Sequence, residues 1–316
     1  MAQLYSDTVR FIRVDRSASG QRMDVFLMRM FKETEQRRII QMVRAGEIVV
    51  NKRRTLPHYR LKSGDVIRMP VIQRETKTQP KVKRDATLQL LLQAMMFEDS
   101  RFLILNKPSG IAVHGGSGLS YGVIEGVRAL YPTAPFLELA HRLDRDTSGC
   151  LVIAKRRSAL RAFQQQQTAG DVDKRYLTLL KGVWKGGGRN INAPLLKYEK
   201  ASGERVVEVS SEGKRSRSFF LPLTRFKDST LIQVKLMTGR THQIRVHAAH
   251  SGHPIAGDDK YGDPIFNRDI AALGLNRLFL HAESICFTLP HLDKSYDIHA
   301  PISPELNTCL TSLGQD

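Results

Sequence analysis

The 316-residue sequence has few cysteines and lacks the segments that direct a chain into or across a membrane. Its three cysteines (Cys150, Cys286 and Cys309) form no even, regularly spaced set of the kind that predicts a disulfide framework. It also lacks a long apolar run and a charged-then-apolar N-terminal signal. We therefore expect a reducing, cytoplasmic setting and no membrane partner.

Motifs of metal-dependent and nucleophilic hydrolases are missing as well. There is no His-Glu-x-x-His, no Cys-x-x-Cys and no Gly-x-Ser-x-Gly motif. His247 and His250 are three residues apart on an expected helix, but that helix carries no glutamate. The glycine-rich segment His114–Gly118 lacks the ending of a nucleotide-binding loop and the spacing of a dinucleotide fingerprint. The sequence therefore predicts no metal and no cofactor, and this segment is interpreted as a flexible active-site wall.

Acidic residues are outnumbered by basic ones, 31 against 49, which gives a formal net charge of +18. A positive field attracts phosphate backbones or anionic lipid, and the missing apolar span argues against lipid. The excess is concentrated near the N-terminus. Residues 10–84 hold 20 Lys and Arg against 7 Asp and Glu, a net charge of +13.

Residues 20–70, within this basic region, have the pattern of a small domain. Apolar side chains recur at i, i+3, i+4 and i+7 over Met23–Met30, which predicts an amphipathic helix. A second helical pattern is buried around Ile39–Val43 and ends at Gly46. Two short strands should follow, at Glu47–Asn51 and Asp65–Met69.

Basic side chains cluster on the second expected helix and in the loop between these strands. The residues that we expect to contact RNA are Arg37, Arg38, Arg44, Lys52, Arg53 and Arg54. A solvated basic face is the alternative, and it would be preferred for an isolated helix. Here the pattern Gly-x-Arg-Met-Asp-x-Phe-Leu at 20–27, followed by Arg44–Asn51 and Gly64–Ile67, resembles the αL RNA-binding module of ribosomal proteins.

The chain becomes polar after this module, and residues 71–85 are expected to form a linker. The expected division is an extension at 1–19, the αL domain at 20–70 and a second domain at 86–316. In the second domain we expect helices at Leu88–Phe97 and at Ala159–Thr168, the latter capped by Ser158 and ended by Gly170, and strands at Phe102–Asn106, Cys150–Ala154, Lys174–Leu180, Arg205–Val209, Arg217–Thr224 and Leu231–Leu236. Strands outnumber helices, which predicts an α+β fold with a mixed, largely antiparallel sheet.

The stretch His141–Gly149 holds one acid between basic neighbours. Asp144 has Arg142 and Arg145 beside it in sequence, and guanidinium groups close to a carboxylate favour its charged form. A turn and the apolar strand Cys150–Ala154 follow. Asp144 should therefore lie, ionised, on a loop at the mouth of a buried strand. The alternative is an aspartate that only organises a turn through its own side chain.

Another arginine lies where a helix is expected to begin. In Thr238–His247, Gly239 ends a strand and Thr241 is a suitable N-cap. Arg240 would then lie at the positive end of the helix dipole, which disfavours a cation by roughly 0.3–1 kcal/mol. The placement makes sense if an anion faces it, either a phosphate or a carboxylate such as Asp144. A surface arginine without a partner is the alternative.

Five motifs occur in the order seen in the RluA family of pseudouridine synthases, which the chain resembles. They are Asn106–Gly110, His141–Gly149, Lys174–Leu177, Thr238–His247 and Gly257–Gly262. Together with the αL module, the resemblance covers nearly the whole chain. The segment Ala112–Gly126 is most similar to family members that act on the large ribosomal subunit, so 23S rRNA is the implied substrate.

The resemblance implies a pseudouridine-synthase fold with a central active-site cleft, and a reaction without a cofactor. The bond between a uridine base and its ribose is cleaved, the base rotates, and it is rejoined through carbon 5. By this match Asp144 is the catalytic aspartate, Tyr176 stacks near the base and assists proton removal, and Arg240 pairs with Asp144. Because the target nucleotide must be flipped out of its stack, Arg142 and Arg145 are expected to hold the distorted backbone.

Other functions share part of this pattern. A non-catalytic rRNA-binding assembly factor would have the charge and the αL module, but no reason to combine Asp144, Tyr176 and Arg240. A hydrolytic RNA enzyme would need a base, a metal or paired carboxylates. A synthase acting on another structured RNA, such as tRNA, would share every motif. The expected partner is large-subunit ribosomal RNA, and the protein is expected to be a monomer without an obligatory protein partner.

Overall fold

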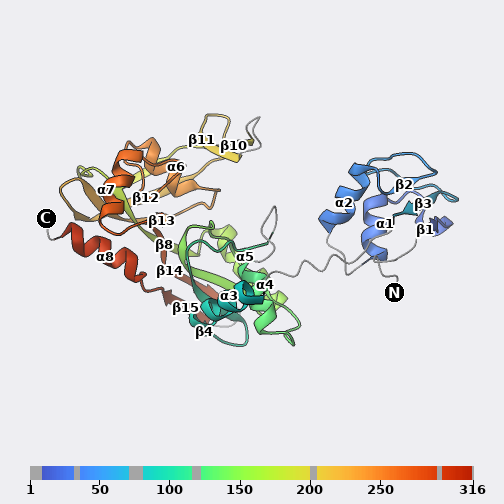
Figure 1. Cartoon of the computed structure of the whole chain (residues 1–316), viewed down its shortest axis with the longest axis horizontal. Helices are drawn as coiled ribbons and strands as arrows, with labels where there is room; N and C mark the ends of the chain where they lie inside the picture. The colour runs from blue at the N-terminus through green and yellow to red at the C-terminus, as the bar shows by residue number, and fades with distance from the viewer. Residues whose placement is uncertain are drawn as a thin grey trace. The chain divides into compact units, whose positions relative to one another are not determined.

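The computed structural model describes residues 9–31, 36–70, 81–115, 122–199, 205–289 and 294–314 (Figure 1). The chain forms two compact units, Met1–Thr78 and Gln79–Asp316. Each unit buries its own cluster of apolar side chains. The units are therefore described separately.

The first unit is a three-stranded antiparallel sheet with two helices, in the strand order β1-β3-β2. Its elements are β1 (Arg10–Arg13), a short 3-10 helix (Arg16–Ala18), α1 (Met23–Met30), α2 (Gln36–Ala45), β2 (Val49–Val50) and β3 (Val66–Met69). The apolar positions expected to face inwards do so, since Leu27, Ile39 and Val43 are buried in one core. Both expected helices are confirmed, and the two strands are present but shorter than expected.

The extension expected at residues 1–19 is wrong for its second half. Strand β1 pairs with β3 from Arg10 opposite Met69 to Arg13 opposite Val66, and the residues that follow it enter the core. The four residues of β1 read Arg-Phe-Ile-Arg, so their apolar side chains are adjacent and do not alternate with polar ones. Its pairing is specified by β3, more than 50 residues later in the chain.

The second unit is built on a ten-stranded sheet whose main path runs β4-β5-β7-β14-β8-β13-β12-β9. Its strands are β4 (Met95–Glu98), β5 (Phe102–Lys107), β6 (Glu138–Leu139), β7 (Ser148–Ala154), β8 (Asp173–Lys181), β9 (Arg189–Asn192), β12 (Arg217–Arg225), β13 (Ser229–Leu236), β14 (Leu280–Leu289) and β15 (Lys294–His299). Strand β6 pairs with β7, and β15 with β14. Only the β7–β14 pair is parallel among the described strands of this sheet, which confirms the expected mixed, largely antiparallel α+β architecture.

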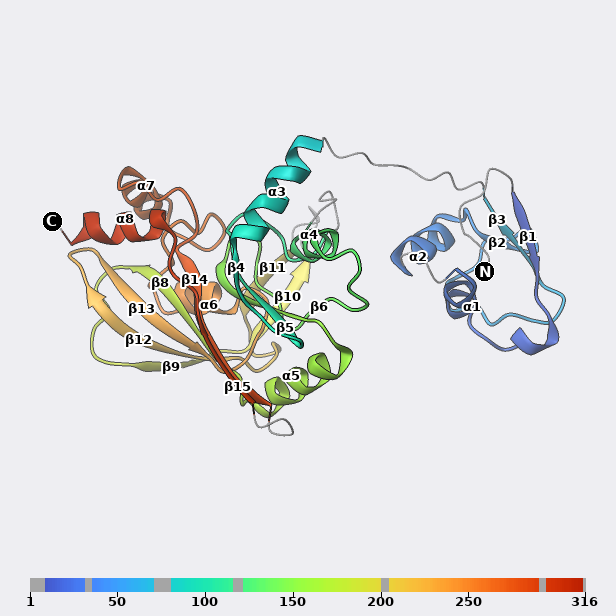
Figure 2. The same cartoon turned by 90° about the horizontal axis from the view of Figure 1, so that it is seen from below.

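Six helices and a separate hairpin complete this unit. They are α3 (Lys81–Gln93), α4 (Val123–Leu130), α5 (Arg157–Ala169), α6 (Gln243–His250), α7 (Pro264–Ala272), α8 (Pro304–Leu313) and the β10–β11 hairpin (Leu195–Glu199 and Arg205–Val209). Helix α5 packs on β7 and β14, α3 on α4, and α6 on β11. Figure 2 shows α3 and α4 beside β4 and β5, and α7 and α8 near the other half of the sheet.

The expected helix at Leu88–Phe97 is partly wrong at both ends. Helix α3 begins at Lys81, inside the stretch interpreted as a linker, and Met95–Glu98 is a strand paired with β5. Lysine and arginine are good helix formers, so a polar composition does not exclude a helix. At the other end, sheet pairing overrides the local helical preference.

Two expected N-caps are also wrong. Ser158 is the second residue of α5, which begins at Arg157, and Thr241 precedes α6 by two residues. The cap of α6 is His242, whose backbone adopts a left-handed φ of +53°. Both Ser158 and Thr241 favour caps by type, but the preceding loop decides where the chain turns helical. Gly170 does end α5, as expected, with φ +89°.

Strand β14 brings the aspartate loop and the tyrosine strand together. It pairs with β7 through His281 opposite Ser148, and with β8 through Leu280 opposite Thr178. The chain leaves the loop at Gly149, where φ is +107° and a Cβ would collide with the backbone of Ala282. Glycine is therefore required for β7 to approach β14 so closely. The strand order β7-β14-β8 positions the candidate site.

Candidate active site

A cavity of about 450 Å³ opens beside the loop between β6 and β7. Asp144, Tyr176 and Arg240, which the sequence analysis singled out separately, all line it. Its wall also includes His114, Arg142, Lys174, His242 and Arg245. Asp144 is the only carboxylate among the described residues of this wall. Residues 116–118 of the glycine-rich segment lie outside the described part of the chain.

Asp144 is held by a short turn and faces the start of α6. Its carbonyl oxygen accepts a hydrogen bond from the backbone N–H of Thr147 at 3.3 Å. The preceding residue, Leu143, is buried in the main core, so the loop cannot swing away freely. The Oδ2 atom of Asp144 lies 4.0 Å from Nε2 of His242. The carboxylate is therefore presented to the cavity from an anchored loop.

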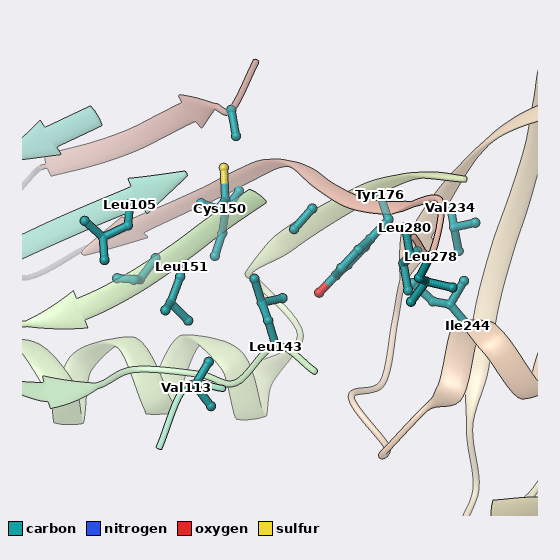
Figure 3. Close-up of a cluster of buried hydrophobic side chains, with 14 of the residues drawn as sticks. Leu105, Val113, Leu143, Cys150, Leu151, Tyr176, Val234, Ile244, Leu278 and Leu280 are labelled. Carbon is teal, nitrogen blue, oxygen red and sulfur yellow. The ribbon is translucent and has the colours of Figure 1, made fainter. Parts of the chain in front are cut away.

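Tyr176 extends from β8 with its ring buried in the core. Figure 3 shows the ring beside Leu278 and Leu280, with the hydroxyl oxygen pointing towards Leu143, the neighbour of Asp144 in sequence. Burial raises the pKa of Tyr176 well above its usual value, and the negative charge of Asp144 raises it further. The hydroxyl therefore stays protonated at physiological pH.

The arginine held inside the site is Arg245, on α6. Its Nε and one terminal nitrogen donate to the two carboxylate oxygens of Asp258, both at 2.7 Å, and its guanidinium lies 5.1 Å from the ring centre of Tyr261. Burial alone would lower the pKa of Arg245, but its bonds to Asp258 and the charges of Asp258 and Asp144 outweigh this and raise it. Arg245 therefore stays charged and contributes a positive charge to the surroundings of Asp144.

Arg240 does not pair with Asp144, and this expectation is wrong. Its side chain is exposed, and its Nε donates to the carbonyl oxygen of Arg215 at 3.3 Å. Arg245 lies five residues further along the same motif and is missed by sequence reasoning. One signal could have found it: Arg245 and Asp258 belong to two motifs that were both recognised, and a buried arginine needs a carboxylate.

The expected basic frame of Asp144 is also only partly present. Arg142 is exposed and lines the same cavity, but Arg145 binds Asp146 with its Nε at 3.0 Å and lines a different cavity. Neighbours in a tight turn point to opposite sides, so closeness in sequence does not place two side chains together.

A short chain of hydrogen bonds connects His242 to the β10–β11 hairpin. The Nδ1 atom of His242 lies 2.8 Å from the hydroxyl of Tyr261, which in turn accepts a hydrogen bond from the backbone N–H of Val207 at 3.2 Å. Burial lowers the pKa of His242, although the charge of Asp144 opposes this shift. His242 is therefore mainly neutral at neutral pH. His242 and Tyr261 belong to the recognised motifs Thr238–His247 and Gly257–Gly262, but the sequence does not indicate a bond between them.

A larger cavity of about 1290 Å³ adjoins the first and shares His242 and Arg245 with it. Its wall contains Lys107, whose Nζ donates to the carbonyl oxygens of Pro108, Ile111 and Arg145 at 2.7, 2.9 and 2.9 Å. Burial lowers the pKa of Lys107 to about 7. Lys107 therefore ties the Asn106–Gly110 motif to the aspartate loop.

In the first unit, the predicted RNA-contacting side chains can be placed only in part. Arg44, Lys52, Arg53 and Arg54 are exposed. Arg37 and Arg38 lie on α2, but their side chains are outside the described part of the structure. A cavity of about 760 Å³ is lined by Asn51, Arg53, Arg54, His58, Tyr59 and their neighbours. The loop after β2 thus carries exposed cations around a hollow.

No group of three or more His, Cys, Asp or Glu side chains placed to hold a metal occurs among the described residues. His247 is buried between Ser216 and Ser218, while His250 is exposed, so the two do not form a ligand pair. Within the same residues, no helix is long and apolar enough to cross a membrane.

Two family models match the chain. The model described as RNA pseudouridylate synthase matches residues 101–250, and the S4 domain model matches residues 21–67. The second match coincides with the segment that resembles the αL module. Among solved structures, human RNA pseudouridylate synthase domain containing 4 superposes with a TM-score of 0.61 at 22% identity, over 74% of this chain and 97% of that one. This likeness concerns the fold.

Curated relatives cover nearly the full length. Ribosomal large subunit pseudouridine synthase C of Yersinia pestis is 50% identical over 96% of both chains. The proteins of the same name from Haemophilus ducreyi and Escherichia coli K12 are 48% identical over 98% and 46% identical over 97% of both chains. The order of the five motifs, the strand order that joins Asp144 to Tyr176, and these matches lead to one conclusion: the chain belongs to the RNA pseudouridylate synthase family and carries an S4 domain at its N-terminal end.

Proposed function

We propose that the protein converts specific uridines of large-subunit ribosomal RNA to pseudouridine, using Asp144 as its catalytic carboxylate. The observation that carries this proposal is that the described wall of one cavity holds a single carboxylate together with a buried, protonated tyrosine. Hydrolysis of a glycosidic bond by acid–base chemistry uses two carboxylates, one of which activates water. An isomerisation needs no water, because the group that leaves is the group that returns. One carboxylate suits the second reaction.

The reaction balances within the nucleotide itself. The bond from ribose C1′ to N1 breaks, a bond from C1′ to C5 forms, and the proton on C5 is lost while N1 gains one. Ionised Asp144 attacks carbon or stabilises the positive charge that develops on the ribose. The raised pKa of Tyr176 keeps its hydroxyl protonated, and a neutral phenol is a poor base. It therefore assists proton removal as a relay, which takes the proton from C5 while it passes its own proton on towards N1.

Arg245 places a fixed positive charge near Asp144. Both oxygens of Asp258 are already bound to its guanidinium, so its orientation is fixed while its positive charge still reaches Asp144. A preorganised charge of this kind stabilises an anion without rearrangement during the reaction. Arg240 and Arg142, at the exposed edge of the cavity, are assigned to the RNA backbone around the flipped nucleotide.

Targeting is assigned to the first unit, whose exposed Arg44, Lys52, Arg53 and Arg54 match phosphate contacts. We also infer that the protein works as a cytoplasmic monomer. All three cysteines are free thiols, which suits a reducing compartment. The names of the relatives specify the large subunit, which favours ribosomal RNA over tRNA.

The proposal is tested on 23S rRNA that lacks modifications, with carbodiimide labelling to locate each pseudouridine. We expect Asp144→Asn to bind the RNA and to form no product, because Asn keeps the shape of the side chain and removes its charge. Asp146→Asn is the matched control, since its carboxylate binds the exposed Arg145 and lies outside the 450 Å³ cavity. Substantial product from purified Asp144→Asn would contradict the assignment of Asp144 as the catalytic carboxylate. If the wild-type protein formed pseudouridine on tRNA and not on 23S rRNA, tRNA would be the substrate instead.

A further inference from the structure

We propose that His242 is a positioning residue for Asp144: a neutral imidazole that carries its proton on Nε2, with that N–H directed at Oδ2 of Asp144. The inference rests on the proposed function, because it assigns a partner to the catalytic carboxylate. It is based on the contacts of His242, Tyr261 and Val207, which only the folded chain brings together.

The proton can be assigned by following donors and acceptors along the chain. The backbone N–H of Val207 can only donate, so the hydroxyl oxygen of Tyr261 accepts from it. Among the contacts that the structure describes, the hydrogen of that hydroxyl has one acceptor, Nδ1 of His242 at 2.8 Å. A neutral imidazole that accepts at Nδ1 carries its proton on Nε2. That nitrogen is the one that faces Asp144.

The separation of 4.0 Å between Nε2 and Oδ2 is longer than a hydrogen bond. Catalytic hydrogen bonds are often long in the free enzyme and shorten when substrate is bound. A movement of about 1 Å closes this one. Holding Oδ2 leaves Oδ1 of Asp144, which has no hydrogen bond or ion pair to any described residue, to face the nucleotide. His242 thus selects which carboxylate oxygen reacts.

The backbone of His242 adopts an uncommon left-handed conformation. It has φ +53°, one of three positive values among the described non-glycine residues, the others being in the Asn51–Lys52 turn of the first unit. Left-handed backbone at a non-glycine residue is unfavourable and persists where surrounding structure enforces it. Here it directs the imidazole between Tyr261 and Asp144.

The β10–β11 hairpin holds the far end of this connection. Val207 lies on β11, and its side chain packs with Leu195 and with Val246 of α6 in a small separate core. The hairpin therefore fixes both the helix that begins at His242 and the hydroxyl that orients its ring. A shift of the hairpin would change the direction of the Nε2–H bond.

Two substitutions at His242 separate a hydrogen bond to Asp144 from support of the backbone. Gln can place an amide N–H where Nε2 lies, whereas Asn places its amide near Nδ1 and falls short of Asp144. Asn, however, adopts the left-handed region more readily than Gln. A purely structural role therefore predicts that His242→Asn is the better variant in both stability and turnover.

We expect the opposite order for turnover. His242→Asn should lower kcat by about 10- to 100-fold, the effect of losing a hydrogen bond to a charged group, with KM nearly unchanged. His242→Gln should keep most of kcat, although its melting temperature is no higher than that of His242→Asn. Tyr261→Phe removes the hydroxyl that sets the tautomer of His242 but keeps the imidazole ring in place. It should therefore lower kcat by less than about tenfold.

The measurements are steady-state kcat and KM for pseudouridine formation on unmodified 23S rRNA, RNA affinity and melting temperature for each folded variant. Turnover by His242→Asn equal to or above that of His242→Gln would overturn the inference, as would a fall that appears only in KM. Failure of the wild-type protein to form pseudouridine on any RNA would instead refute the proposed function. The two failures are therefore distinguishable.

Discussion

Arg245 interacts with two carboxylates, Asp258 and Asp144, and both favour its charged form. Its guanidinium binds both oxygens of Asp258, and its charge faces Asp144. Only a planar guanidinium group can bind both oxygens of Asp258 and at the same time hold its positive charge near Asp144. Arg240, in the same motif, has a single hydrogen bond to a carbonyl oxygen on the exposed rim. Lysine should therefore be able to replace Arg240 but not Arg245.

We expect Arg245→Lys to lower kcat by about 10- to 100-fold, because lysine keeps the charge and loses the bidentate geometry. Arg240→Lys should leave kcat close to wild type and change stability by less than about 0.5 kcal/mol. Both variants are compared by steady-state kinetics and thermal unfolding. A larger loss for Arg240→Lys would restore Arg240 as the arginine that serves Asp144.

At the residue scale, the motifs place Asp144 and Tyr176 in separate stretches of the sequence, and both side chains line one cavity in the structure. Their roles in the reaction stay a prediction. The sequence did not predict the features that depend on the direction in which a side chain points. Arg145 turns to Asp146, and Arg245 is selected over Arg240 by a partner 13 residues away. Sequence distance does not report such directions.

At the scale of elements, the β7–β14 pair depends on the missing side chain at Gly149. Its φ of +107° disfavours any L-residue, and a Cβ there would meet the backbone of Ala282. Gly274 has a similar φ of +91°, but nothing lies within 4 Å of the position of its Cβ. The two glycines share the backbone requirement and differ in crowding.

Gly274→Ala should therefore cost about 1–2 kcal/mol of the free energy of unfolding, from left-handed strain alone. Gly149→Ala should cost roughly 1–3 kcal/mol more, because backbone must move to admit the methyl group. Urea unfolding of both variants gives the difference. Equal losses would mean that β7 and β14 separate easily, and that the strand order is not what holds the aspartate loop.

The strands that could be predicted are those with continuous apolar runs, such as β5, β7 and β8. The edge strands β1 and β9 were missed because their pairing is specified by distant partners. The helix cap at His242 was missed because Thr241 is the better cap by residue type, whereas the loop places the left-handed turn at His242. Tertiary contacts, rather than local preferences, decide these features.

For the molecule as a whole, two separate cores predict that binding and chemistry can be divided. Residues 1–78 carry 17 Lys and Arg against 8 Asp and Glu, half of the net charge in a quarter of the chain. A chain shortened to begin at Gln79 keeps α3 complete, including the buried Leu91, and keeps the whole candidate site. A start at Ala86, the boundary expected from the sequence, would remove the first residues of α3.

We expect this shortened protein to fold and to form pseudouridine at raised enzyme concentration or lowered salt. Removing each phosphate contact should flatten the slope of log affinity against log salt by about 0.7–0.9. Site choice on 23S rRNA should become less selective. Full-length and shortened proteins are compared across a salt series, with pseudouridine mapped by position. An unchanged slope and an unchanged map would make the basic first unit a solvated surface.

The position of β14 between β7 and β8 also sets the order in which the protein gains its properties during synthesis. The first unit completes its sheet once Met69 has been made, because all three of its strands precede or end at that residue. Asp144 and Tyr176 are joined only through Leu280–Leu289, near the end of the chain. Since domains fold as their residues emerge, a nascent chain acquires its RNA-binding unit long before its reaction centre. The candidate reaction centre is thereby incomplete until the ribosome has almost finished translating the chain.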